Sequence, residues 1–151
     1  MIIIMAGLPK SGKTVLARQL SSQSKGSFHV DPASFVPPDA SPDEHRDAIL
    51  CGWEIAYEKL LEIIDKNPSN TLIIFDTCAS KTSVVETIAI RGKKAGHKIH
   101  MVFVETPKEI CIKRGADASV VSRYEQQFIS SLKNSAGCCD KFTTIPGNRR
   151  C

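Results

Sequence analysis

The clearest chemistry lies in residues 7–14, Gly-Leu-Pro-Lys-Ser-Gly-Lys-Thr, which have the spacing G-x-x-x-x-G-K-[ST] of a phosphate-binding loop. The glycines allow backbone conformations that a Cβ would forbid, so the N–H groups of the loop can converge on phosphate oxygens. Lys13 supplies a mobile charge for the β- and γ-phosphates, and the Thr14 hydroxyl is a ligand for magnesium. We expect ATP or GTP to bind, with Mg²⁺, at Gly7, Leu8, Pro9, Lys10, Ser11, Gly12, Lys13 and Thr14.

Two aspartates each follow an apolar run, where a strand of a parallel sheet would end. Asp76 follows the L-I-I-F run at 72–75, and a carboxylate placed there binds magnesium directly or through water. Its alternative role is to cap the next turn. Asp31 follows the F-H-V run at 28–30, at the sheet edge along which ligands of α/β folds bind. We expect Asp31 to accept the proton of an acceptor hydroxyl; alternatively, it begins a turn at Pro32.

Two arginines could stabilise charge on a transferred phosphoryl group. Arg114 ends a predicted helix over 106–114, and Arg123 lies near the start of the next one, 120–132. A helix–loop–helix of this kind can close over a nucleotide and exclude water. Arg114 is the first choice for a catalytic arginine, and Arg123 is a second, nucleotide-binding choice. Their alternative roles are a cation favouring a helix C-terminus and a solvated surface residue.

The elements that must position these residues alternate between apolar runs and helical patterns, as in βαβ units. Strands are predicted at 2–5, 28–30, 72–75, 99–104 and 142–145. The S-P-D-E sequence at 41–44 and the T-P-K-E sequence at 106–109 each predict a capping box that opens a helix. The pattern predicts one domain over 1–151: an α/β, three-layer fold with a five-stranded parallel sheet and helices on both faces.

Bulk composition fits a globular protein: 151 residues, 42% hydrophobic and 24% charged. No apolar run approaches the roughly 20 residues that cross a bilayer, and residues 1–6 are too short for a signal peptide. We therefore expect a cytoplasmic protein without a membrane partner, and the oligomeric state stays open. The six cysteines have neither zinc-site nor C-x-x-C spacing. The net charge of +4 is concentrated in residues 66–151, which could attract an anionic acceptor such as nucleic acid or could be solvated surface.

Taken together, these motifs resemble small P-loop kinases, and most closely the kinase domain of phage-type 5′-hydroxyl polynucleotide kinases. The match at 7–14 is the specific part; Phe75-Asp76-Thr77 resembles that family's acid–threonine pair, and Lys113-Arg114-Gly115 resembles its lid. The resemblance implies that Asp31 is the general base. Unlike that family, this chain has no arginine between Asp31 and Arg46.

Three functions follow as expectations. The first is a kinase that transfers the γ-phosphoryl group of ATP to the 5′-hydroxyl of DNA or RNA. The second is a kinase of a small metabolite, nucleoside or nucleotide. The third is a nucleotide-binding regulator that turns over slowly. Arg114 and Asp31 favour a kinase, and the basic second half leans towards nucleic acid.

Overall fold

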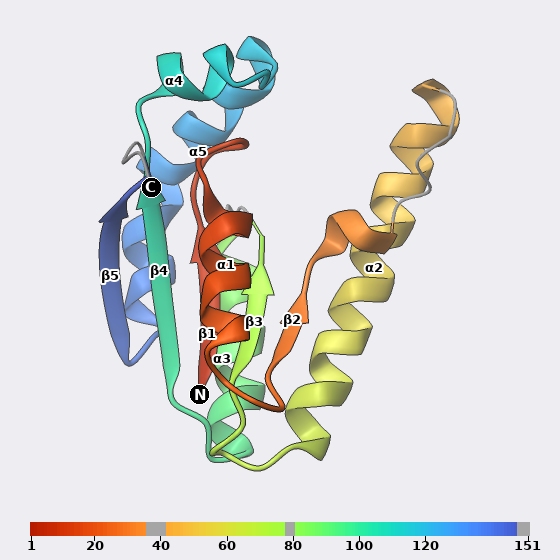
Figure 1. The fold of residues 1–151 in the computed structure, drawn as a ribbon, viewed down its shortest axis with the longest axis vertical. Helices are drawn as coiled ribbons and strands as arrows, with labels where there is room; N and C mark the ends of the chain where they lie inside the picture. Colours follow the sequence, from red (N-terminus) through yellow and green to blue (C-terminus); the bar gives the residue numbers. More distant parts are fainter. Residues whose placement is uncertain (36–41, 78–80, 148–151) are drawn as a thin grey trace.

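A computed structural model describes residues 1–35, 42–77 and 81–147, with the backbone alone for 42–50. Five parallel strands form one sheet in the order β2-β3-β1-β4-β5 (Figure 1). The strands are β1 (Ile2–Ala6), β2 (Phe28–Val30), β3 (Ile73–Asp76), β4 (Ile99–Glu105) and β5 (Lys141–Pro146). The helices are α1 (Lys13–Ser22), the 3₁₀-helix η1 (Pro32–Phe35), α2 (Pro42–Lys66), α3 (Thr82–Lys94), α4 (Lys108–Lys113) and α5 (Ala118–Gly137).

The two central strands are fully buried, which is why their sequences are continuous apolar runs rather than alternating ones. Every residue of β1 and β3 is buried, including Asp76 at the end of β3. The register pairs Ile2 with Ile73 on one side and with Ile99 on the other. The carboxyl ends of β1 and β3 therefore lie next to each other, where residues 7–14 begin.

Successive side chains of β1 point to opposite faces of the sheet, because a strand is pleated. Ile2 and Ile4 belong to the larger core, together with buried apolar residues of α2 and α3; Leu132 of α5 packs against this core. Ile3 and Met5 belong to a second core with Ala17 of α1. In Figure 1, α1 lies in front of the sheet, and α3 and α5 lie behind it. The predicted three-layer α/β fold, with helices on both faces, is confirmed.

Helix starts agree with the predictions in part. Helix α2 begins at Pro42, as predicted, whereas Ser41 lies outside the described residues. The capping box predicted at 106–109 is wrong: α4 begins at Lys108 without a side-chain cap, and the Thr106 hydroxyl bonds to Ser11 instead. Helix α5 begins two residues before the predicted start because the Asp117 carboxylate accepts bonds from two backbone N–H groups of the first turn.

Two properties of the whole chain were also expected from composition. Among the described helices, none is long and apolar enough to cross a membrane. The apolar or helical surroundings of Cys51, Cys78 and Cys111 predict that these cysteines pack as small hydrophobic residues. Cys111 does so, with no exposed surface. Cys51 does not, because it lies on an exposed position of α2. Cys78 and Cys151 lie outside the described residues.

Candidate nucleotide-binding and phosphoryl-transfer site

The loop at 7–14 has a backbone that only glycine adopts without strain at two of its positions. Gly7 has φ 148° and Gly12 has φ 105°, and Lys10 lies in the left-handed region with φ 65°. A Cβ on Gly7 would lie 2.8 Å from the carbonyl oxygen of Val104. Gly7 is therefore required both by its conformation and by the close approach of β4.

The carbonyl groups of this loop are bonded to protein donors. Lys13 Nζ donates to the carbonyls of Gly7 at 3.0 Å and Leu8 at 2.7 Å. The carbonyl of Lys10 accepts from Arg114 Nη1 at 3.1 Å, and that of Ser11 accepts from the Thr106 hydroxyl at 2.8 Å. These four carbonyls are therefore already occupied by donors of the protein.

Three N–H groups at the end of the loop have no such partner. Within the described residues, the backbone N–H groups of Gly12, Lys13 and Thr14 donate to no protein oxygen, and the buried Ser11 hydroxyl has no partner. These groups lie at the N-terminus of α1, where the helix dipole favours negative charge. A loop with bonded carbonyls and free donors is suited to an anion, as the sequence predicted.

Asp76 lies where the sequence predicted, at the carboxyl end of β3 and next to β1, with a side chain that is 3% exposed. Its Oδ2 lies 3.1 Å from Nε2 of His29, on β2. The sequence predicted no role in the site for His29, so this partner was missed. One indication was available: His29 precedes Asp31 by two residues, which places both on one face of a strand.

Asp31 lies one residue beyond β2, level with Asp76, because Val30 pairs with Phe75 in the parallel register. Its Oδ1 accepts the N–H of Ala33 at 3.0 Å, and its carbonyl accepts the Ser34 hydroxyl. Asp31 therefore does begin η1, the alternative role considered for it. The bond uses one carboxylate oxygen and leaves Oδ2 for a substrate, so the two roles are compatible.

The two arginines of the α4–α5 unit differ in position. Arg114 Nη1 and Nη2 bond to the carbonyls of Lys10 and Gly147, each at 3.1 Å, so this side chain joins the loop to the end of β5. Arg123 is exposed, and its guanidinium lies 5.8 Å from the ring centroid of Tyr124. The structure brings Arg114 to the loop and does not bring Arg123 to it.

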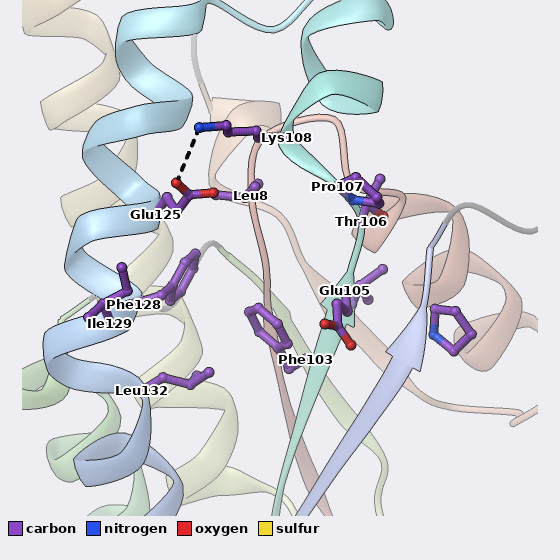
Figure 2. Close-up of a pocket in the computed structure, with 12 residues that line it drawn as sticks. Leu8, Phe103, Glu105, Thr106, Pro107, Lys108, Glu125, Phe128, Ile129 and Leu132 are labelled. Atoms are coloured by element: carbon purple, nitrogen blue, oxygen red, sulfur yellow. Dashed lines mark ion pairs between the residues drawn. The ribbon is translucent and has the colours of Figure 1, made fainter.

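The α4–α5 unit also packs directly on the loop. Leu8 forms a buried cluster with Cys111 of α4 and with Val121 and Phe128 of α5. Phe103 and Phe128 form an edge-to-face pair, with ring centroids 5.4 Å apart, and line a cavity of about 610 Å³. In Figure 2, the ion pair between Lys108 and Glu125 lies above them. The base of the expected lid is thus part of a packed apolar cluster.

Comparison with known proteins assigns the fold. No family model and no curated protein matches the chain. A structure from the PezAT toxin–antitoxin system of Streptococcus pneumoniae superposes with a TM-score of 0.70 and 15% identity, covering 100% of this chain and 69% of that chain. Shikimate kinase from Aquifex aeolicus gives 0.60 at 17% identity, covering 99% and 89%. A gluconokinase from Sinorhizobium meliloti gives 0.61 at 11% identity, covering 98% and 83%.

The chain has the P-loop NTPase fold. Residues 7–14 are its P-loop, and β3 is the strand beside it. A second cavity, of about 770 Å³, adjoins the P-loop and is lined by Arg114, by the end of β5 and by the flank of α1. Val104, Ile145 and Pro146 give it an apolar wall, as is usual for pockets that bind small molecules.

The oxygen donors beside the P-loop fit magnesium. Mg²⁺ prefers oxygen ligands and is commonly bound by one or two carboxylates together with phosphate oxygens. Thr14 is half-buried at the start of α1, and Asp76 is a buried carboxylate with one oxygen bonded to His29. These two residues would hold the ion.

The basic second half of the chain does not face the P-loop as a whole. Arg91, Lys93 and Lys94 lie in the last turn of α3, Lys98 precedes β4, and Lys141 begins β5. All five lie at the amino ends of the parallel strands, the lower end of Figure 1, opposite the P-loop. The expectation that this charge attracts an acceptor to the site is therefore not supported for these residues.

Proposed function

We propose that the protein is an ATP-dependent phosphotransferase that moves the γ-phosphoryl group of a nucleoside triphosphate to an acceptor hydroxyl. The observation that carries the proposal is the P-loop itself, with carbonyls bonded to Lys13, Thr106 and Arg114 and with free N–H donors at the start of α1. Asp76 and Asp31 lie level with each other on adjacent strands. We assign the first carboxylate to the metal and the second to the acceptor.

In the proposed reaction, the acceptor oxygen attacks the γ-phosphorus in line with the bond to the bridging β–γ oxygen, and that bond breaks to release the diphosphate. The free oxygen of Asp31 takes the hydroxyl proton. Lys13 exchanges its contacts with the Gly7 and Leu8 carbonyls for contacts with the β- and γ-phosphates. Arg114 has further N–H donors that can bond to the negatively charged phosphate oxygens. Magnesium, when bound at Thr14 and Asp76, neutralises charge on the phosphates.

For the acceptor, we propose a small hydroxyl compound, since gluconokinase and shikimate kinase share this fold. A 5′-hydroxyl of DNA or RNA was the first expectation, and it depended in part on the basic second half. Lys93, Lys94 and Lys98 lie at the amino ends of the strands, opposite the P-loop. The basic charge of the second half therefore no longer favours a nucleic-acid acceptor over a metabolite.

The test is transfer from γ-labelled ATP to a panel of sugars, nucleosides, small hydroxy acids and 5′-hydroxyl oligonucleotides. Label in a small compound supports the proposal, whereas label in an oligonucleotide restores the first expectation. Label in free phosphate alone would favour the slow regulator over a kinase. Lys13→Ala is expected to lower transfer about a thousandfold, by analogy with other phosphate-binding groups; near-normal transfer in that variant would overturn the site.

A further inference from the structure

We propose that His29 positions the Asp76 carboxylate as a magnesium ligand, an inference that rests on the proposed function. His29 belongs to β2 and Asp76 to β3, yet Nε2 and Oδ2 are 3.1 Å apart. In the register His29 pairs with Ile74, two residues before Asp76. The bond is therefore a diagonal contact between adjacent strands on the face that α1 covers, since Ile74 packs with Ala17.

The chemistry of the pair determines which atom donates. An ionised carboxylate only accepts hydrogen bonds, so Nε2 of His29 carries the proton and donates it to Oδ2. This bond fixes the carboxylate plane and leaves Oδ1 as the oxygen for a metal. Carboxylates that bind metals are commonly hydrogen-bonded in this way, and loss of such partners weakens metal affinity about 10- to 100-fold.

Burial explains why Asp76 needs such a partner. The Asp76 side chain is 3% exposed and that of His29 is 18% exposed, so water does not replace a lost bond easily. Lys13, the nearby cation of the P-loop, directs its ammonium group to the carbonyls of Gly7 and Leu8. The imidazole therefore restrains Asp76 in the protein before any nucleotide arrives.

The first experiment measures how nucleotide affinity depends on magnesium, using a non-hydrolysable ATP analogue in calorimetric titrations from EDTA to millimolar Mg²⁺. In His29→Leu, the affinity gained from Mg²⁺ should fall about 10- to 100-fold, with affinity in EDTA unchanged. His29→Gln, whose amide can donate, should recover most of that gain. Wild-type magnesium dependence in folded His29→Leu would overturn the inference.

His100→Leu is the matched control. His100 is also a half-buried strand histidine whose Nε2 bonds across to the next strand, at 2.8 Å from the Thr143 hydroxyl. It pairs with Ile3 and so lies on the same face of the sheet, but on β4 and away from Asp76. Its removal should leave the magnesium dependence unchanged. An equal effect in both histidine variants would mean general damage to the sheet and would contradict a positioning role for His29.

A second measurement needs no variant. In ¹⁵N-labelled wild-type protein, the ring resonances of His29 should shift when Mg²⁺ is added to the nucleotide complex, and those of His100 should not. An unchanged His29 resonance contradicts the inference. If the wild type binds no nucleotide, the proposed function fails and the inference fails with it. If it binds with magnesium but transfers nothing, the kinase proposal fails and the role of His29 stands.

Discussion

The Thr106 hydroxyl, immediately after β4, donates to the backbone carbonyl of Ser11 in the P-loop at a distance of 2.8 Å, and this contact is buried. The two residues are 95 positions apart in the chain. The same carbonyl lies against the segment after β5, because a Cβ built on Gly147 would come within 2.2 Å of Ser11 O and of Thr106 Oγ1. The shape of the P-loop therefore depends on the ends of two other strands.

Gly147→Ala tests that dependence. A methyl group at this position has no space, and overpacking of this kind costs about 1–3 kcal/mol, so the variant should unfold at lower urea and bind nucleotide more weakly. Gly137→Ala is the control, because no heavy atom lies within 4 Å of a Cβ there, and it should be at least as stable as the wild type. Equal stability in the two variants would contradict this prediction, because it would mean that the segment after β5 can move to accommodate the methyl group without disturbing the P-loop.

Arg114→Ala removes two bonds, to the carbonyls of Lys10 and Gly147, and a positive charge beside the P-loop. We expect turnover to fall about a thousandfold or more, as for other arginines that stabilise a transferring phosphoryl group. Steady-state kinetics measure the loss. Lys113→Ala, one residue earlier on an exposed position, is expected to be near normal. Turnover near the wild-type value in Arg114→Ala would remove this residue from the catalytic set.

Asp31→Asn separates the two roles of this side chain. Asparagine keeps a carbonyl oxygen for the Ala33 N–H, so η1 should form and ATP should still bind, but the group can no longer take a proton. Transfer should be lost while nucleotide affinity stays. Asp140→Asn is the comparison, because Asp140 also caps a backbone N–H, that of Ile99, but at the opposite edge of the sheet. Persistent transfer in Asp31→Asn means that the general base lies elsewhere.

Thiol reactivity should follow burial. Desolvation, with a contribution from the neighbouring Cys138, raises the pKa of Cys139 to about 11, so at pH 8 roughly one thiol in a thousand is ionised. Cys51 is exposed. Iodoacetamide at pH 8 followed by peptide mapping should modify Cys51 at least about ten times faster, since only the thiolate reacts. In denaturant the difference should disappear; a difference that persisted would contradict burial as its cause.

The sequence was sufficient for the elements and for most of the P-loop chemistry. Continuous apolar runs predicted the central strands β1 and β3 because both faces of a parallel sheet are covered there. Proline at 42 and the helical apolar spacing after it gave α2, because these signals are local. Thr106 shows where local reasoning failed: its spacing to Glu109 matches a capping box, but its hydroxyl bonds to a residue 95 positions away.

The sequence by itself determined the phosphate-binding loop, the succession of strands and helices along the chain, and the positions of Asp31 and Asp76 after the carboxyl ends of their strands. Those features depend on local backbone preference and on the side-chain period of each element. Only the tertiary structure decided that His29 bonds to Asp76, that Arg114 and not Arg123 reaches the P-loop, and that Lys93, Lys94 and Lys98 lie at the far edge. These relationships depend on the order of the strands within the sheet and on their register, because both bring together residues that are far apart in the chain.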